Sequence, residues 1–286
     1  MLGFDLREPC TLEEAFSLLN PGDPAVRPMG GGTALMLMMK AQIFKPIRLV
    51  SLRRIGGPFE GLNVSVDGHH MRIGAMTTFS ELENSPTIAQ HFPVIPQAMR
   101  TLANIRVRNV ASVGGNLAHG DPHLDLPPVW MALAAQARII GKSGERTVPV
   151  EDLFVGYYET TVQDGELIAD LLVPIRPTWR STYVKVTTRA IHDWPALGIA
   201  ISAELVGRRV GDLRIVLSAA LDKPTRLVAA EEVLRGAEIG KALLHRVGEA
   251  AVAEVDIHSD SRGSAAYKNH LLRVHLVRAF ESLVGA

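Results

Sequence analysis

The sequence of 286 residues predicts an α+β protein with two domains. A glycine turn at 30–32 stands between two strand-like segments, as in a strand–helix–strand unit. From residue 183 onward, consecutive strand-like segments are followed only by helical ones, which is typical of an α+β layer. Prolines within 174–178 separate the two patterns. The chain is long enough for two buried cores, and we predict domains 1–176 and 177–286.

The first domain is expected to begin with a helix and a strand–turn–helix–strand unit. Thr11 and Glu14 have the spacing of a capping box, which predicts a short helix after Thr11. Segment 25–29 predicts a strand that leads into the glycine turn. The apolar, methionine-rich segment 35–41 predicts a buried helical turn, and segment 48–52 predicts the next strand.

The remainder of the first domain mixes short strands and helices. The pair Asp67-Gly68 predicts a two-residue hairpin, and Thr78 is expected to cap a short helix. The other expected elements are a helix at 93–102, an apolar helix or strand at 129–137, and strands at 138–140 and 166–174.

The second domain is expected to place strands before helices. The predicted strands cover 183–186, 196–205 and 213–220, and the predicted helices cover 229–235, 241–254 and 265–283. The last helix has apolar residues at helical spacing, at Leu272, Leu276, Ala279 and Leu283.

Composition excludes several classes of protein. The formal net charge is zero and no strongly basic run occurs, so nucleic acid is not an expected partner. No apolar run reaches the roughly 18 residues of a membrane span, and the N-terminal segment lacks the features of a secretory signal. The single cysteine, Cys10, excludes an internal disulfide and an iron–sulfur cluster held by this chain alone. We therefore expect a cytoplasmic protein.

Two glycine turns carry the main functional signal. The first is Pro28-Met29-Gly30-Gly31-Gly32-Thr33-Ala34-Leu35, and the second is Ser112-Val113-Gly114-Gly115-Asn116. Glycines let a backbone approach a ligand closely, and successive free N–H groups form an anion-binding concavity. Two such turns suggest a ligand with two phosphates, on which both turns converge. The first turn alone is weak evidence, because it is neither a dinucleotide fingerprint nor a P-loop.

The second turn and the segment after it permit several interpretations. We expect side-chain hydrogen bonds from Ser112 and Asn116, backbone N–H groups from Gly114 and Gly115, and contact of Asp125 with ribose hydroxyls. A metal site formed by His119, Asp121, His123 and Asp125 is disfavoured, because alternate spacing fits no standard zinc pattern. A hydrolase that uses Ser112 is disfavoured more strongly, because the Gly-x-Ser-x-Gly elbow is absent.

Together these motifs resemble the FAD-binding medium subunit of the molybdenum hydroxylases, the family of xanthine dehydrogenase and carbon monoxide dehydrogenase. The resemblance rests on the first turn, on the block from Ile105 to Asn116 and on the Asp125-Leu126-Pro127-Pro128 run. The block carries a two-residue shift between Ile105 and Asn109. Further matches lie at 73–78, 166–168, 173–174 and 189–194, so that the resemblance spans almost the whole chain.

The resemblance implies a vanillyl-alcohol-oxidase-like FAD-binding domain of two α/β subdomains, followed by a C-terminal α+β domain. In it, residues 28–35 and 112–116 hold the pyrophosphate of non-covalent FAD, and Asp125 lies toward the adenosine ribose. Trp194 lies close to the isoalloxazine. The implied cofactor-binding residues are Pro28, Met29, Gly30, Gly31, Gly32, Thr33, Ala34, Leu35, Leu102, Ser112, Val113, Gly114, Gly115, Asn116, Asp125, Ile168, Lys185 and Trp194.

Two positions depart from the family pattern. Ala34 replaces a common Asp or Ser, which removes one expected hydrogen bond. His192 replaces a common Gly before Asp193, which is expected to reshape the loop over the flavin. The Asp125–Pro128 run is more similar to the N-heterocycle hydroxylases than to the carbon monoxide enzymes.

The resemblance also implies an electron-transfer role without a catalytic acid, base or metal in this chain. A small partner subunit with two [2Fe–2S] clusters supplies electrons, a large molybdopterin subunit hydroxylates the substrate, and FAD passes electrons to an external acceptor. The assembly is expected to be a dimer of heterotrimers. The alternatives are a stand-alone FAD-dependent oxidase or reductase, and a ligand-free assembly subunit, which the intact glycine turns disfavour.

Overall fold

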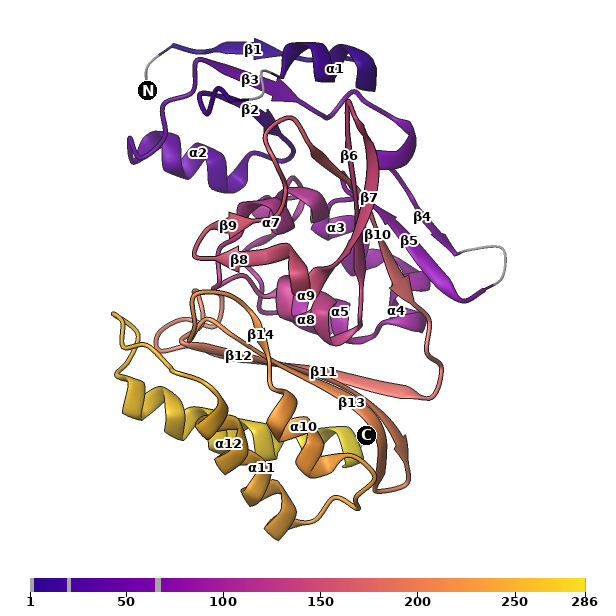
Figure 1. Ribbon diagram of the computed structural model, residues 1–286, viewed down its shortest axis with the longest axis vertical. Helices are drawn as coiled ribbons and strands as arrows, with labels where there is room; N and C mark the ends of the chain where they lie inside the picture. Colours follow the sequence, from indigo (N-terminus) through magenta and orange to yellow (C-terminus); the bar gives the residue numbers. More distant parts are fainter. Residues whose placement is uncertain (1–2, 20–21, 65–67, 286) are drawn as a thin grey trace.

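The computed structural model of the protein describes residues 3–19, 22–64 and 68–285. Figure 1 shows an elongated molecule with three parts along its long axis. A small N-terminal sheet lies at one end, a five-stranded sheet with short helices lies in the middle, and a four-stranded sheet covered by long helices lies at the other end. This mixed architecture confirms the α+β class.

The N-terminal part is a three-stranded parallel sheet in the order β1-β3-β2. Its elements are β1 (Asp5–Arg7), α1 (Leu12–Leu18), β2 (Val26–Met29), α2 (Thr33–Lys40) and β3 (Arg48–Ser51). The predicted unit is therefore present, with α2 as the crossover between the parallel strands β2 and β3.

Two local expectations for this part need correction. The Thr11 hydroxyl caps α1 by accepting from the Glu14 N–H, but the Glu14 carboxylate accepts from the Cys10 N–H, one residue before the expected cap. Helix α2 is not the buried turn that its composition suggested. Only Met39 is buried and Leu37 is 63% exposed, because α2 lies at the edge of the molecule (Figure 1).

The middle part contains a five-stranded antiparallel sheet in the order β4-β5-β10-β6-β7. Its strands are β4 (Leu62–Val64), β5 (His70–Gly74), β6 (Gln136–Gly141), β7 (Gly144–Pro149) and β10 (Leu167–Pro174). The hairpin between β4 and β5 is present, although Asp67 of its predicted turn lies outside the described residues.

Short helices and a small hairpin pack around this sheet. They are η1 (Gly57–Phe59), α3 (Phe79–Asn84), α4 (Pro86–His91), α5 (Val94–Met99), α6 (Ile105–Arg108), α7 (Val113–His119), α8 (Leu126–Ala132), α9 (Val150–Leu153), β8 (Phe154–Gly156) and β9 (Glu159–Thr160). Thr78 caps α3 with a complete capping box, as expected. Among these elements and the sheet strands, the sequence did not predict η1, α4, α6, α7, α9, β8, β9 or the edge strand β7.

The C-terminal part is an antiparallel sheet in the order β11-β12-β13-β14. Its elements are β11 (Trp179–Val186), β12 (Leu197–Val206), β13 (Arg209–Ser218), β14 (Thr225–Arg226), α10 (Val228–Leu234), α11 (Lys241–Glu254) and α12 (Ala265–Gly285). The predicted strands and helices are all present, with boundaries shifted by a few residues.

Both faces of this C-terminal sheet are covered. Side chains alternate along a strand, so that Ile199 and Ile201 pack toward the long helices while Ala200 joins the core of the preceding part. Tyr183 of β11 joins that same core. The C-terminal sheet therefore packs directly on the middle part. No helix within 3–19, 22–64 and 68–285 is both long and apolar enough to cross a membrane.

Candidate functional site

The two glycine turns lie side by side, as expected. A Cβ atom on Gly31 would lie 1.8 Å from the Val110 carbonyl oxygen, and one on Gly30 would lie 2.6 Å from Ser112 Oγ. The clash at Gly31 is with backbone, which cannot give way, whereas the clash at Gly30 is with a side-chain hydroxyl. The first turn therefore needs glycine at position 31 in order to pack against the segment that leads into the second turn.

The first turn presents a row of unused backbone donors. The N–H groups from Gly30 to Leu35 have no acceptor in the described part of the chain, and Met36 is the first residue to bond back, to the Gly32 carbonyl at 2.9 Å. Gly32, with φ of 73°, is the N-cap of α2. A helix start with free N–H groups and a positive dipole end favours an anion such as a phosphate.

The second turn differs from its expected role. The Gly114 N–H donates to the Ala75 carbonyl at 2.8 Å, and the Gly115 N–H donates to Ser112 Oγ at 3.3 Å. The expectation that these two amides are offered to a ligand is therefore wrong. Gly114 is needed for packing instead, since a Cβ there would lie 2.6 Å from the Ala75 Cβ.

Two side chains of the second turn, Asn116 and Ser112, have hydrogen-bonding atoms that remain available to a ligand. Asn116 Oδ1 is buried and has no hydrogen-bond partner in the described part of the chain. Buried polar atoms without partners are rare, so this amide oxygen fits a ligand that supplies a donor. Ser112 caps α7 by accepting from Gly115, which leaves its hydroxyl proton available for donation.

The remaining candidates near the turns lie in supporting positions. Met29 Sδ would be 3.2 Å from a Cβ on Gly32, so its side chain lies against the first turn. Val113 is fully buried, and its N–H donates to the Thr77 carbonyl. Ile168 is also buried and precedes Ala169 on β10. The Ala169 carbonyl accepts from the Ala75 N–H, and the Ala75 carbonyl accepts from the Gly114 N–H. Four further candidates are each half-buried, namely Pro28, Thr33, Ala34 and Leu35.

A second cluster joins three candidates that are distant in the sequence. Lys185 Nζ lies 3.0 Å from Asp125 Oδ2 and donates to the Thr101 carbonyl at 3.0 Å, beside the buried Leu102. The Tyr183 hydroxyl donates to Asp125 Oδ1 at 2.7 Å. Both oxygens of the Asp125 carboxylate therefore already accept hydrogen bonds within the chain.

Burial governs the ionisation of this cluster. Removal from water raises the pKa of Asp125, and the nearby Lys185 charge and the Tyr183 hydrogen bond oppose that rise. Burial and the neighbouring Asp125 carboxylate raise the pKa of Tyr183, which keeps its hydroxyl a donor. The sequence did not indicate Tyr183. A signal was available in the alternation of β11, which places residues 183 and 185 on one face.

Trp194 lies at a third point, on the loop between β11 and β12. Trp194 is 48% exposed, and its ring stacks on the His123 imidazole, with ring centres 5.7 Å apart and an interplanar angle of 15°. The Arg262 guanidinium carbon lies 5.3 Å from the Trp194 ring centre. This loop therefore rests on the segment that follows the second turn.

His123 is held by a buried carboxylate. Its Nδ1 lies 2.9 Å from Asp121 Oδ1, and the Tyr158 hydroxyl donates to Asp121 Oδ2 at 3.0 Å. Burial alone would raise the pKa of Asp121, but these hydrogen bonds, chiefly from His123, lower it below its ordinary value. His119 instead packs edge-on against Tyr158, and Asp125 belongs to the second cluster.

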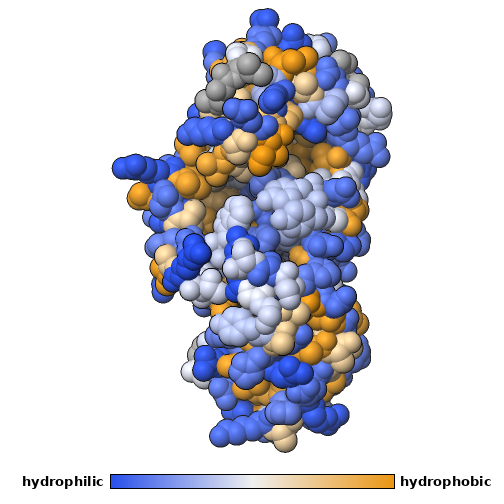
Figure 2. Space-filling view, turned by 90° about the vertical axis from the view of Figure 1, so that its left-hand side faces the viewer, coloured by the Kyte–Doolittle hydropathy of each residue, from blue (hydrophilic) through white to orange (hydrophobic). Residues whose placement is uncertain are grey.

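The surface of the molecule is hollowed on one side. Figure 2 shows the side that carries α2 and the β8–β9 hairpin, with a recess between the N-terminal part and the middle part. Hydrophobic and weakly polar side chains border the recess. Such a mixed, concave surface is typical of a cofactor site.

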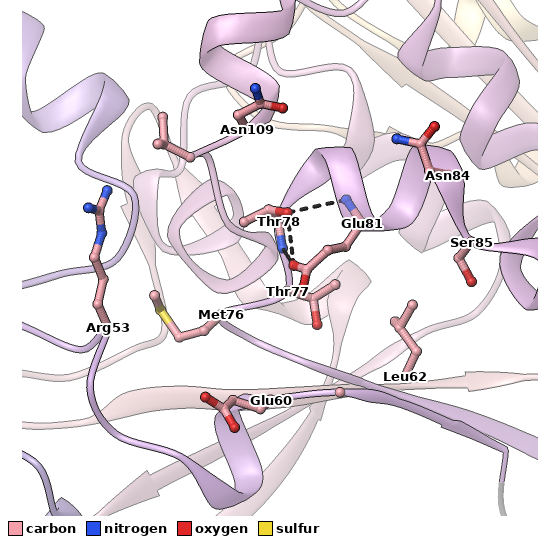
Figure 3. A pocket seen from close by; sticks show the side chains of 12 residues that line it. Arg53, Glu60, Leu62, Met76, Thr77, Thr78, Glu81, Asn84, Ser85 and Asn109 are labelled. Atoms are coloured by element: carbon pink, nitrogen blue, oxygen red, sulfur yellow. Dashed lines mark hydrogen bonds between the residues drawn. The ribbon is translucent and has the colours of Figure 1, made fainter.

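A separate cavity of about 860 Å³ is lined by residues from the segments 53–62, 76–85 and 109–110 (Figure 3). Its lining includes Arg53, whose Nη2 lies 3.5 Å from the Gly31 carbonyl oxygen, and Val110, two residues before the second turn. Thr78 and Glu81 line another wall and are joined by the hydrogen bonds of the α3 capping box. The lining of the cavity therefore contacts the first turn through Arg53 and comes near the second turn at Val110.

Comparisons with known proteins agree along the whole chain. A family model for the FAD binding domain in molybdopterin dehydrogenase matches residues 2–176, and one for the CO dehydrogenase flavoprotein C-terminal domain matches residues 182–283. The carbon monoxide dehydrogenase medium chain of Afipia carboxidovorans is 31% identical, over 97% of this chain and 96% of its own. The nicotine 6-hydroxylase medium subunit of Paenarthrobacter nicotinovorans is 31% identical, over 93% and 92%.

Solved structures show the same similarity in three dimensions. A chain of the reconstituted CO dehydrogenase from Oligotropha carboxidovorans matches with a TM-score of 0.94 at 31% identity, covering 100% of this chain and 99% of that one. A chain of quinoline 2-oxidoreductase from Pseudomonas putida 86 matches with a TM-score of 0.91 at 26% identity, covering 99% and 98%.

Proposed function

The chain belongs to the FAD-binding medium subunits of the molybdenum hydroxylase family, and from this premise we propose that it passes electrons from a partner's [2Fe–2S] clusters through FAD to an external acceptor. The observation that supports this most directly is the row of unused N–H groups from Gly30 to Leu35, packed against the second turn. A dinucleotide diphosphate supplies the acceptors that these donors lack.

FAD, when bound, supplies the redox chemistry, while the protein binds and orients it. We propose that the amides of 30–35 hold the diphosphate, with an added hydrogen bond donated by the Ser112 hydroxyl, and that Asn116 Oδ1 accepts from an O–H or N–H group elsewhere on the cofactor. Val113, Gly114 and Gly115 support this site by shaping the second turn. Met29, Pro28 and Ile168 are proposed to line the cofactor near the turns.

We propose that the second cluster and Trp194 mark the flavin end of the site. Lys185 lies on β11, and the loop that follows β11 carries Trp194. Asp125 is assigned to this end together with Lys185, because the two side chains form an ion pair with 3.0 Å between Lys185 Nζ and Asp125 Oδ2. Leu102 beside Lys185 completes this part. Domain 1–176 would then hold the diphosphate, and domain 177–286 would contribute Lys185 and Trp194.

The proposed partners follow from the family. The relatives reported above are medium chains or subunits of larger enzymes, which supports a small iron–sulfur partner and a large molybdopterin partner. The arrangement proposed is a dimer of heterotrimers. The cytoplasm is the proposed compartment, since the chain has one cysteine and no internal disulfide.

Native mass spectrometry of the purified assembly tests this proposal. The expected result is one FAD for each copy of this chain, together with an iron–sulfur subunit and a molybdopterin subunit. An assembly that contains this chain without FAD would contradict it. The isolated chain, loaded with FAD, is expected to show no substrate turnover, whereas turnover without partners would favour a stand-alone oxidase or reductase.

A further inference from the structure

Strand β11 sends two polar side chains toward the middle part of the molecule. Residues 183 and 185 share one face of the strand, and Tyr183 and Lys185 both reach the Asp125 carboxylate. Val184 and Val186 point the other way and pack against the helix-covered core. The alternation of one strand therefore sets the surroundings of a buried acid that belongs to another domain.

Building on the proposed function, we propose that Tyr183 is a positioning residue: its hydrogen bond holds the Asp125 carboxylate ionised and paired with Lys185, and the charge of this pair sets the reduction potential of the FAD.

In the described part of the chain, the hydrogen bonds of the Asp125 side chain all go to Tyr183 and Lys185. It precedes α8 as the N-cap residue, yet its side chain makes no capping hydrogen bond. The two side-chain donors to its carboxylate both come from β11, one for each oxygen. Lys185 and Tyr183 are also the titratable groups that face Asp125 in the described part of the chain.

The neighbouring strand leaves room for the phenol. Gly198 on β12 is paired with Lys185 in the sheet. A Cβ atom on Gly198 would lie 2.9 Å from the Tyr183 hydroxyl oxygen and 2.5 Å from Ser218 Oγ. Any larger residue there would displace the hydroxyl. Gly198 therefore leaves the space that the Tyr183 hydroxyl occupies when it donates to Asp125.

Removal of the hydroxyl has a defined electrostatic consequence. Asp125 Oδ1 would stay buried without a donor, which favours the neutral acid. The Lys185 cation would then be less compensated. A net positive charge near a redox group favours its electron-richer form, so the potential of the FAD would become more positive.

The test uses the FAD-loaded assembly with Tyr183→Phe, which keeps the buried ring. The matched control is Ser181→Ala, which deletes a hydroxyl on the same face of β11 that donates to Ser202 Oγ, 2.9 Å away, and not to Asp125. Released flavin measures FAD content, and redox titrations from weakly acidic to weakly alkaline pH measure the potential.

We expect Tyr183→Phe to retain FAD and to shift its potential to a more positive value, by an amount that grows as the pH falls. Asp125→Asn is expected to shift it in the same direction at every pH, whereas Ser181→Ala should match the wild type. Retained FAD with an unchanged potential in Tyr183→Phe would overturn this inference alone. Loss of FAD from Tyr183→Phe but not from Ser181→Ala would show a role in binding and would also overturn it. Absence of FAD from the wild-type assembly would instead overturn the proposed function, and the inference with it.

Discussion

The Val110 carbonyl oxygen occupies the space that any side chain on Gly31 would need, at 1.8 Å from the position of a Cβ atom. The atoms around it are backbone, including the Val110 carbonyl carbon at 2.6 Å and the Ala111 Cα at 2.9 Å. Neither turn can shift without moving the other. The glycine is therefore required by the contact between two segments that are far apart in the sequence.

Gly31→Ala is expected to separate the two turns. Overpacking of this kind costs about 1–3 kcal/mol, and the displaced N–H row should lose FAD from the assembly. Unfolding curves and released flavin measure both effects. Gly3→Ala is the control, because a Cβ atom there meets nothing within 4 Å. An FAD content equal to that of the wild type in Gly31→Ala would contradict the prediction.

Ser112→Ala is expected to weaken both the fold and the cofactor site. Loss of the α7 cap should lower the free energy of unfolding by about 1 kcal/mol. Ser85→Ala is a matched control, because Ser85 caps α4 by the same bond to the third following residue. Equilibrium titration with FAD should show weaker binding for Ser112→Ala alone. Equal affinities in the two variants would remove Ser112 from the site.

Lys185→Met should be far more harmful than the loss of an exposed ion pair. It leaves the Asp125 carboxylate buried without its cation, which costs about 3–5 kcal/mol. Arg273→Met breaks the exposed pair with Glu249 and should cost about 0–1 kcal/mol. Chemical denaturation of both variants checks the difference. Similar losses would show that the Asp125–Lys185 pair is no more important than a surface contact.

His119 is expected to make stability sensitive to mild acid. Burial lowers the pKa of His119 below its ordinary value of 6.5, so the folded protein favours the neutral ring. The unfolded chain then binds the proton more readily, and stability falls as the pH decreases below 6.5. The nearby Asp121 charge opposes this shift without cancelling it.

Comparison of wild type with His119→Gln isolates this contribution, since His275 and Asp125 titrate in both proteins. The variant should lose less stability between neutral pH and weakly acidic pH, measured by denaturation at each pH. Parallel curves would mean that the His119 ring is not held neutral by the fold.

Much of the fold follows from local signals in the sequence. The β2–α2–β3 unit, the Thr78 cap, the strands β11 to β13 and the helices of the C-terminal part were predicted, because turn residues and apolar periodicity act over a few neighbouring residues. Helix α4 escaped prediction although Ser85 and Pro86 are start signals, since its six residues give no clear period. The exposure of α2 was also missed, because composition does not reveal the edge of a molecule.

The sequence by itself determined the two glycine turns, the α+β class and the resemblance from which FAD was expected. Only the tertiary structure decided that the first turn keeps its N–H groups free while those of Gly114 and Gly115 are consumed by the fold, and that Tyr183 and Lys185 enclose Asp125. The physical reason is that a hydrogen-bond donor is available to a ligand only when no other part of the chain supplies an acceptor. That depends on which distant segments are brought into contact, and contact is settled by packing rather than by local sequence.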